Sequence, residues 1–163
     1  MKNPINIFDV TNYIIDNFHQ KYELTPMKLQ KIIFYVYVQH LIENNGLPLF
    51  QDILEAWAYG PVFPNLYLKL QHQRNYPILT QAIAEGQARK LRPTHKQLID
   101  KIVNHYGAYT ASQLVDKTHH EDPWKINFLD ADWSCNIISD ADLYQFYAKP
   151  HQLSKLKENQ KNE

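Results

Sequence analysis

The segment from Leu24 to Gly46 constrains the fold of this 163-residue chain more than any other part. Thr25 is a suitable N-cap, and Pro26 suits the first helical position, where its missing N–H costs nothing. Apolar and aromatic side chains then follow on nearly every side, until Asn45-Gly46 predicts the end of a helix. A helix that is apolar all round must be buried, so we expect this one at the centre of the fold.

After this helix the apolar pattern changes its period. Residues 54–59 alternate between small or aliphatic side chains and the larger Glu55, Trp57 and Tyr59. This alternation predicts a short strand or extended segment with those three side chains on one face. We expect Gly60-Pro61 to end the strand.

Helices are predicted on both sides of these two segments. Asn3 and Pro4 predict the start of the first one, and further helices are expected over 64–73, weakly over 77–88, and over 94–106, with two more after Thr110 and Ser139. The predicted fold class is therefore mainly α. We expect a single compact helical domain over residues 1–148 with a minor short β segment or hairpin, and a flexible C-terminal tail over 149–163.

Composition narrows the class of protein. The single cysteine, Cys135, excludes an internal disulfide and a four-cysteine zinc site. No apolar run approaches the roughly 20 residues that span a bilayer, and the first residues do not resemble a signal peptide. We therefore expect a cytoplasmic protein without membrane insertion.

Charge is balanced overall but uneven along the chain. Residues 61–105 carry a net charge of +5 and residues 106–148 a net charge of −5. These segments can pair across the folded surface, or one of them can offer a charged face to a macromolecular partner, and both interpretations stay open. Nucleic acid is not expected as a partner, because its binding usually needs a larger basic excess than a neutral chain provides.

Reaction chemistry has little support in the sequence. Residues 119–122 (His-His-Glu-Asp) are the densest set of possible metal ligands, but adjacent side chains diverge and the spacings of known zinc motifs are absent. No nucleophile motif occurs, and the four glycines stand too far apart to cradle a phosphate. No catalytic residue, metal or cofactor is predicted, and an enzyme that uses His119, His120 and Asp122 or Glu121 is a rival hypothesis.

The motif segments together resemble one family over about residues 7–147. The pattern consists of Leu24-Thr25-Pro26-x-Lys28-Leu29-Gln30-Lys31, Tyr35, Pro48-Leu49-Phe50, Glu55-Ala56-Trp57-x-Tyr59-Gly60-Pro61-Val62-x-Pro64, Tyr67, Thr118-His119 and Pro123-Trp124. In this order and spacing it resembles the Panacea, or SocA-like, antitoxin domain.

The resemblance implies an antitoxin of a two-gene toxin–antitoxin system that neutralises a cognate protein toxin by direct binding. It also implies two alternatives: a proteolytic adaptor that delivers the toxin to a Clp-type protease, and a phage or mobile-element effector that binds a host protein. Whether the chain forms a homo-oligomer is left open.

Eight residues at motif positions carry polar or amphipathic side chains and are the candidates for partner binding. Aromatic side chains on a stiff turn are typical anchors of protein interfaces. The alternative is that the same residues form one buried polar network between the central helix, the strand and the late loop. The candidates are Lys28, Gln30, Lys31, Glu55, Trp57, Tyr59, His119 and Trp124.

Overall fold

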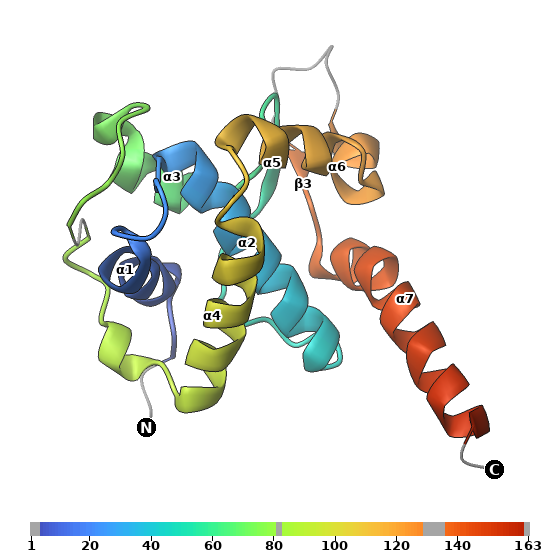
Figure 1. Cartoon of the computed structure of the whole chain (residues 1–163). Helices are drawn as coiled ribbons and strands as arrows, with labels where there is room; N and C mark the ends of the chain where they lie inside the picture. Colours follow the sequence, from blue (N-terminus) through green and yellow to red (C-terminus); the bar gives the residue numbers. More distant parts are fainter. Residues whose placement is uncertain (1–3, 81–82, 129–135, 162–163) are drawn as a thin grey trace.

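A computed structural model of the chain describes residues 4–80, 83–128 and 136–161, with side chains up to Pro150 (Figure 1). Helices predominate in this part of the chain, and a small antiparallel sheet accompanies them, so the predicted mainly α fold class is confirmed. The elements are α1 (Ile7–Phe18), α2 (Pro26–Glu43), β1 (Glu55–Trp57), β2 (Gly60–Val62), α3 (Pro64–Leu70), the 3-10 helices η1 (Gln71–Gln73) and η2 (Ala88–Lys90), α4 (Pro93–Tyr106), α5 (Ala111–His119), α6 (Asp122–Asn127), β3 (Asn136–Ile137) and α7 (Asp140–Lys161).

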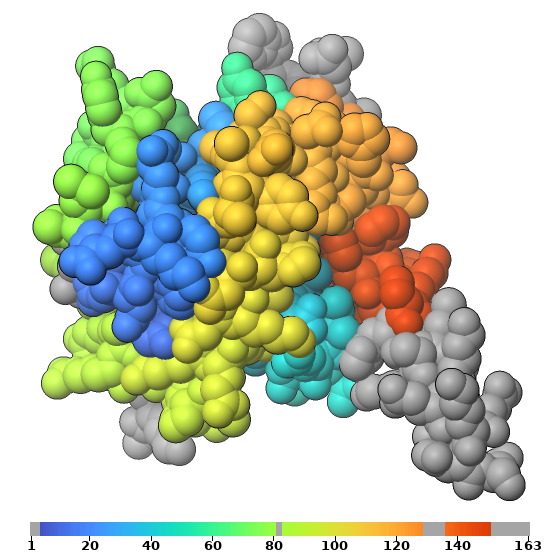
Figure 2. Space-filling model, viewed as in Figure 1, coloured from blue at the N-terminus to red at the C-terminus, as the bar shows by residue number. Residues whose placement is uncertain are grey.

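Helix α2 lies at the centre, as its apolar pattern predicts. It contacts α1, α3, α4, α5, α7 and β2, and α1, α4 and α5 lie over it on the face shown in Figure 2. Ile32, Ile33 and Phe34 are completely buried, which means that consecutive positions all face other elements. The predicted start is also correct, because the Thr25 hydroxyl accepts a hydrogen bond from the Lys28 amide and Pro26 occupies the first turn.

The sheet has the order β2-β1-β3, with both neighbours antiparallel to β1. Trp57 pairs with Gly60 across a tight hairpin whose turn is Ala58-Tyr59. The prediction that Gly60-Pro61 ends the strand segment was wrong, because these residues begin β2. Gly60 has a φ of +100°, and Pro61 is tolerated because β2 is an edge strand of the described sheet.

The first helix begins later than predicted. Asn6 caps it rather than Asn3, which lies outside the described residues. The Asn6 side chain accepts from the Asp9 amide at 2.9 Å, and the Asp9 carboxylate accepts from the Asn6 amide at 2.8 Å. This reciprocal capping box satisfies two N–H groups at once, so Pro4 remains outside the helix.

The prediction of a weak helix over 77–88 was also wrong. The described residues of this segment contain no α-helix, and only η2 forms at its end. Side chains of α1 bind its backbone instead: Asp9 accepts from the Gln87 amide at 2.6 Å, and Asn12 donates to the Ile83 carbonyl at 2.7 Å. Tertiary hydrogen bonds thus override a weak helical propensity.

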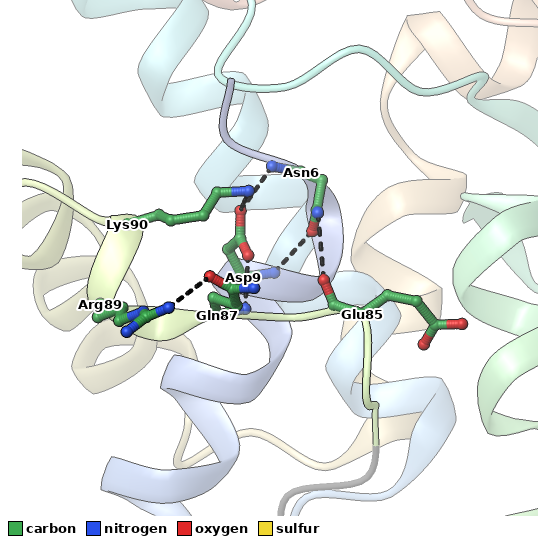
Figure 3. A network of polar contacts seen from close by, with 6 residues as sticks. All are labelled: Asn6, Asp9, Glu85, Gln87, Arg89 and Lys90. Carbon is green, nitrogen blue, oxygen red and sulfur yellow. Dashed lines mark hydrogen bonds and ion pairs between the residues drawn. The ribbon is translucent and has the colours of Figure 1, made fainter. Parts of the chain in front are cut away.

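Asp9 is the centre of this connection (Figure 3). Its carboxylate has no solvent exposure and forms an ion pair with Lys90 at 3.0 Å, in addition to the bonds from Asn6 and Gln87. A buried carboxylate is stable only with such partners. Asp9 therefore ties the start of α1 to the chain segment that leads into α4.

Helix α7 continues through Pro150 to Lys161, and its C-terminal part extends away from the other helices (Figure 1). The sequence did not predict this helical backbone beyond residue 150. The flexibility of the tail 149–163 stays a prediction.

Replacing Asp9 by alanine is expected to lower the free energy of unfolding by about 3 kcal/mol, because the half-buried Lys90 ammonium and two backbone amides lose their acceptor. Asp16→Ala is the matched control, since Asp16 lies on the same helix but is exposed. Urea denaturation measures the free energy of unfolding of both variants. Equal losses in the two variants would show that the Asp9 network does not stabilise the fold.

Candidate functional site

A cleft of about 430 Å³ lies between the N-terminal part of α2, the β1–β2 hairpin and the α3–η1 segment. Its lining is mainly apolar and aromatic, which is the usual character of a binding cleft. The lining residues are Pro26, Met27, Gln30, Lys31, Trp57, Ala58, Tyr59, Val62, Tyr67, Leu70, Gln71 and Arg74.

The hairpin and α3 supply the aromatic side of the cleft. The rings of Trp57 and Tyr67 meet edge to face at a centroid distance of 5.0 Å, and the Trp57 indole N–H donates to the Glu55 carboxylate at 2.7 Å. Tyr59 lies in the turn and is 66% exposed. Trp57 is thus fixed by its neighbours, so it loses little side-chain entropy when a partner contacts it.

Lys31 is the unusual group in the wall of the cleft. Its side chain is only 1% exposed, and its ammonium donates to the Pro61 carbonyl at 2.8 Å. Burial lowers the pKa of Lys31 to about 7, because a buried ammonium loses its hydration. Among the described residues, no carboxylate forms an ion pair with it to offset that loss.

Gln30 binds the same part of the hairpin through the backbone. Its side-chain amide donates to the Phe63 carbonyl and accepts from the Phe63 amide, both at 3.0 Å. Together with the bond from Lys31 to Pro61, these contacts hold β2 against α2. The position of the cleft wall is therefore fixed by two consecutive residues of the central helix.

Trp124 and His119 support the hairpin without lining the cleft. The Trp124 indole N–H donates to the Trp57 carbonyl at 2.7 Å, and its ring stacks on His119 at a centroid distance of 3.9 Å. Burial lowers the pKa of His119, and the nearby Lys31 charge lowers it further. The lowered pKa favours the neutral imidazole, whose ring packs against the tryptophan.

The eight sequence candidates therefore divide into two groups. Gln30, Lys31, Trp57 and Tyr59 line the cleft, and Glu55 adjoins it through Trp57. The remaining three make other contacts: the buried Lys28 ammonium donates to the Gly107 carbonyl, and the half-buried rings of His119 and Trp124 stack on each other.

Four residues that line the cleft were not among the candidates: Met27, Tyr67, Leu70 and Arg74. Of these, Tyr67 belongs to the family pattern. Met27 could have been found, because it is a large apolar residue between the N-cap and the buried positions of α2. No sequence pattern indicated Arg74, because its position beside the cleft depends on the turn that follows η1, where its φ is +52°.

Within the described residues no three His, Cys, Asp or Glu side chains lie together as metal ligands, and no helix there is long and apolar enough to cross a membrane. His119 and His120 diverge: His119 stacks on Trp124, whereas His120 contacts the Asp116 carbonyl.

Most of the residues that line this cleft lie in a segment that matches a known family. The family model described as "Antitoxin SocA-like, Panacea domain" matches residues 29–125, more than half of the chain. The chain belongs to this family. The match includes Gln30 and Lys31, the hairpin, α3, the supporting helix α5 and the first turn of α6, which carries Trp124.

A curated relative agrees with this family assignment. The chain is similar to Antitoxin SocA of Caulobacter vibrioides (strain NA1000 / CB15N), with 27% identity over 112 residues. The similarity covers 63% of this chain and 59% of that protein, so the chain spans less than two thirds of the relative. No solved structure matches.

Gly60 is expected to be essential for the hairpin's position in the Panacea domain. A Cβ at Gly60 would lie 2.6 Å from the Thr118 hydroxyl and 2.8 Å from the Lys31 Cε, and the residue has a positive φ. Gly60→Ala should lower the free energy of unfolding by about 3 kcal/mol and displace Lys31.

Gly46→Ala separates the clash from the backbone strain. Gly46 also has a positive φ, but an added Cβ would meet only the Tyr144 ring at an ordinary 3.6 Å. This variant should lose about 1 kcal/mol. Thermal or urea unfolding gives the stability of the Gly60→Ala and Gly46→Ala variants. An equal loss of stability in the two would contradict the tight packing of Gly60 on Lys31 and Thr118.

Proposed function

We propose that this protein is an antitoxin that neutralises a cognate protein toxin by direct binding through the cleft and its aromatic rim. Family membership supports the antitoxin role. The observation that carries the binding surface is the exposed aromatic rim on a hairpin held from both sides, by Lys31 and by Trp124.

The rim has the properties of an interface centre. Met27, Tyr59 and Tyr67 are exposed around a single apolar cleft, and exposed apolar groups that gather in this way typically mark a contact surface. A stable complex buries about 1,200 Å² or more, so the cleft would form only its centre. Leu68, which follows Tyr67 on α3, is also exposed.

Neutralisation by this route requires no reaction. Occupying the surface that the toxin uses, or holding the toxin in an inactive form, is sufficient. We therefore propose a binding protein that makes and breaks no covalent bond.

Trp57→Ala and Tyr59→Ala test this function. Each should weaken toxin binding by about 30-fold or more, since truncation of a central aromatic residue typically costs 2 kcal/mol or more. The measurements are growth rescue of cells that express the toxin encoded by the adjoining gene, and the affinity of the purified pair.

Tyr109→Ala is the control, because Tyr109 is exposed on the α4–α5 connection and does not line the cleft. It should rescue as well as the unaltered chain. If both cleft variants fold and rescue fully, the cleft is not the toxin-binding surface.

A second candidate function is suggested by α7. Because its C-terminal part extends away from the other helices (Figure 1), it can be reached while the cleft is occupied. The protein could thus deliver a bound toxin to a Clp-type protease. An effector role against a host protein is a further possibility, which the absence of a toxic adjoining gene would favour.

Deletion of residues 151–163 distinguishes delivery from occupancy. If α7 is the protease contact, the deletion should lengthen the toxin's half-life in cells at least several-fold while leaving toxin affinity unchanged. Neutralisation by occupancy alone predicts the same half-life with and without the segment. Pulse-chase measurement of the toxin decides between them.

A further inference from the structure

We propose that the cleft binds the C-terminal residue of the partner protein, with its apolar side chain against Met27, Trp57 and Tyr67 and its carboxylate on the Lys31 ammonium. This inference rests on the proposed function, because it specifies which part of the partner the surface takes. It follows from the charge, the burial and the shape of the cleft wall.

The charge of the cleft favours an anion. Among the described residues its lining contains two cations, Lys31 and Arg74, and no carboxylate. The nearby Glu55 carboxylate already accepts a hydrogen bond from the Trp57 indole. A negative group entering beside Lys31 would therefore meet complementary charge.

Lys31 also has unused hydrogen-bonding capacity. An ammonium has three N–H donors, and the described residues provide one acceptor, the Pro61 carbonyl. A buried cation with one neutral acceptor is costly, whereas a carboxylate would supply both charge and acceptors. Lys31 is thus a buried polar group in the wall of an apolar cleft. An anion is the natural complement of its ammonium.

A chain terminus fits this arrangement better than an acidic side chain does. An Asp or Glu residue brings little apolar surface, and the chain on both sides of it would bury backbone N–H and C=O groups against an apolar wall. A C-terminal apolar residue carries a large side chain and a carboxylate on one Cα, and no chain continues beyond it. Its side chain can therefore fill the apolar part of the cleft while its carboxylate reaches the Lys31 ammonium.

Protonation of Lys31 should accompany binding. Burial lowers the pKa of Lys31 to about 7, so above pH 7 the free protein holds the amine increasingly in its neutral form. A bound carboxylate favours the ammonium and raises that pKa. Affinity for a carboxylate should consequently fall as the pH rises above about 7. His119 from α5 and Arg74 from the α3 side also face this region, but His119 has a lowered pKa and stays neutral over that range.

The test uses three small probes with the full chain at pH 6.5. N-acetyl-phenylalanine has the proposed terminal carboxylate, N-acetyl-phenylalaninamide lacks it, and N-acetyl-Phe-Glu-amide carries its carboxylate on a side chain. Amide chemical shifts of the ¹⁵N-labelled protein locate each probe and give its dissociation constant. N-acetyl-phenylalanine should bind in the cleft at least tenfold more tightly than either of the other two.

Lys31→Met tests the role of the ammonium while keeping the length of the side chain. It should abolish the preference for the acid over the amide. Lys28→Met is the matched control, because Lys28 is also buried on α2 and bonded to a backbone carbonyl, but does not line the cleft. It should keep the preference.

The unaltered chain provides a test that does not depend on how the variants fold. Between pH 7.5 and 8.5 its affinity for N-acetyl-phenylalanine should fall by about tenfold, while its affinity for the amide stays constant. Equal binding of acid and amide, absence of binding, tighter binding of the glutamate probe, or a preference that survives Lys31→Met would each overturn the proposal. Loss of toxin rescue in Trp57→Ala would still support the antitoxin surface in those cases.

Discussion

The hydrogen bonds from Gln30 and Lys31 to the backbone of residues 61–63 determine how the rest of this molecule is arranged. They join the buried central helix to a strand of three residues, which would be too short to be stable alone. When Lys31 is protonated, its bond to the Pro61 carbonyl has a charged donor, and such a bond contributes about 1.5–3 kcal/mol, whereas an ordinary amide bond contributes about 1 kcal/mol. Once β2 is held, β1 pairs with it, Trp57 is placed beside α3, and the cleft follows.

Much of this could be predicted from the sequence because the relevant signals are local. Thr25-Pro26 fixes the start of α2, and the absence of a polar face on that helix requires a central position. The alternation over 54–59 gives the strand and correctly places Trp57 beside Glu55. Four of the eight candidate residues line the cleft because the motif segments that contain them meet there.

The parts that could not be predicted depend on contacts between distant segments. The backbone of residues 83–87 follows α1 because Asp9 and Asn12 bind it, and no pattern within that segment reveals this. Gly60-Pro61 has the composition of a chain stop, yet both residues pair with β1, and Thr118 and Lys31 lie so close to Gly60 that a Cβ would clash there. Likewise, Lys28 and Lys31 differ by one turn of helix, but only their partners show that one supports α4 and the other lines the cleft.

The way in which α2 holds the hairpin has a consequence for divergence within the family. Gln30 and Lys31 bind main-chain atoms of Pro61 and Phe63, and Trp124 binds the main-chain carbonyl of Trp57. Such bonds are indifferent to which side chains the hairpin carries. The scaffold can therefore stay constant while outward positions such as Met27, Tyr59 and Tyr67 are exchanged, and one architecture can acquire new specificities without refolding.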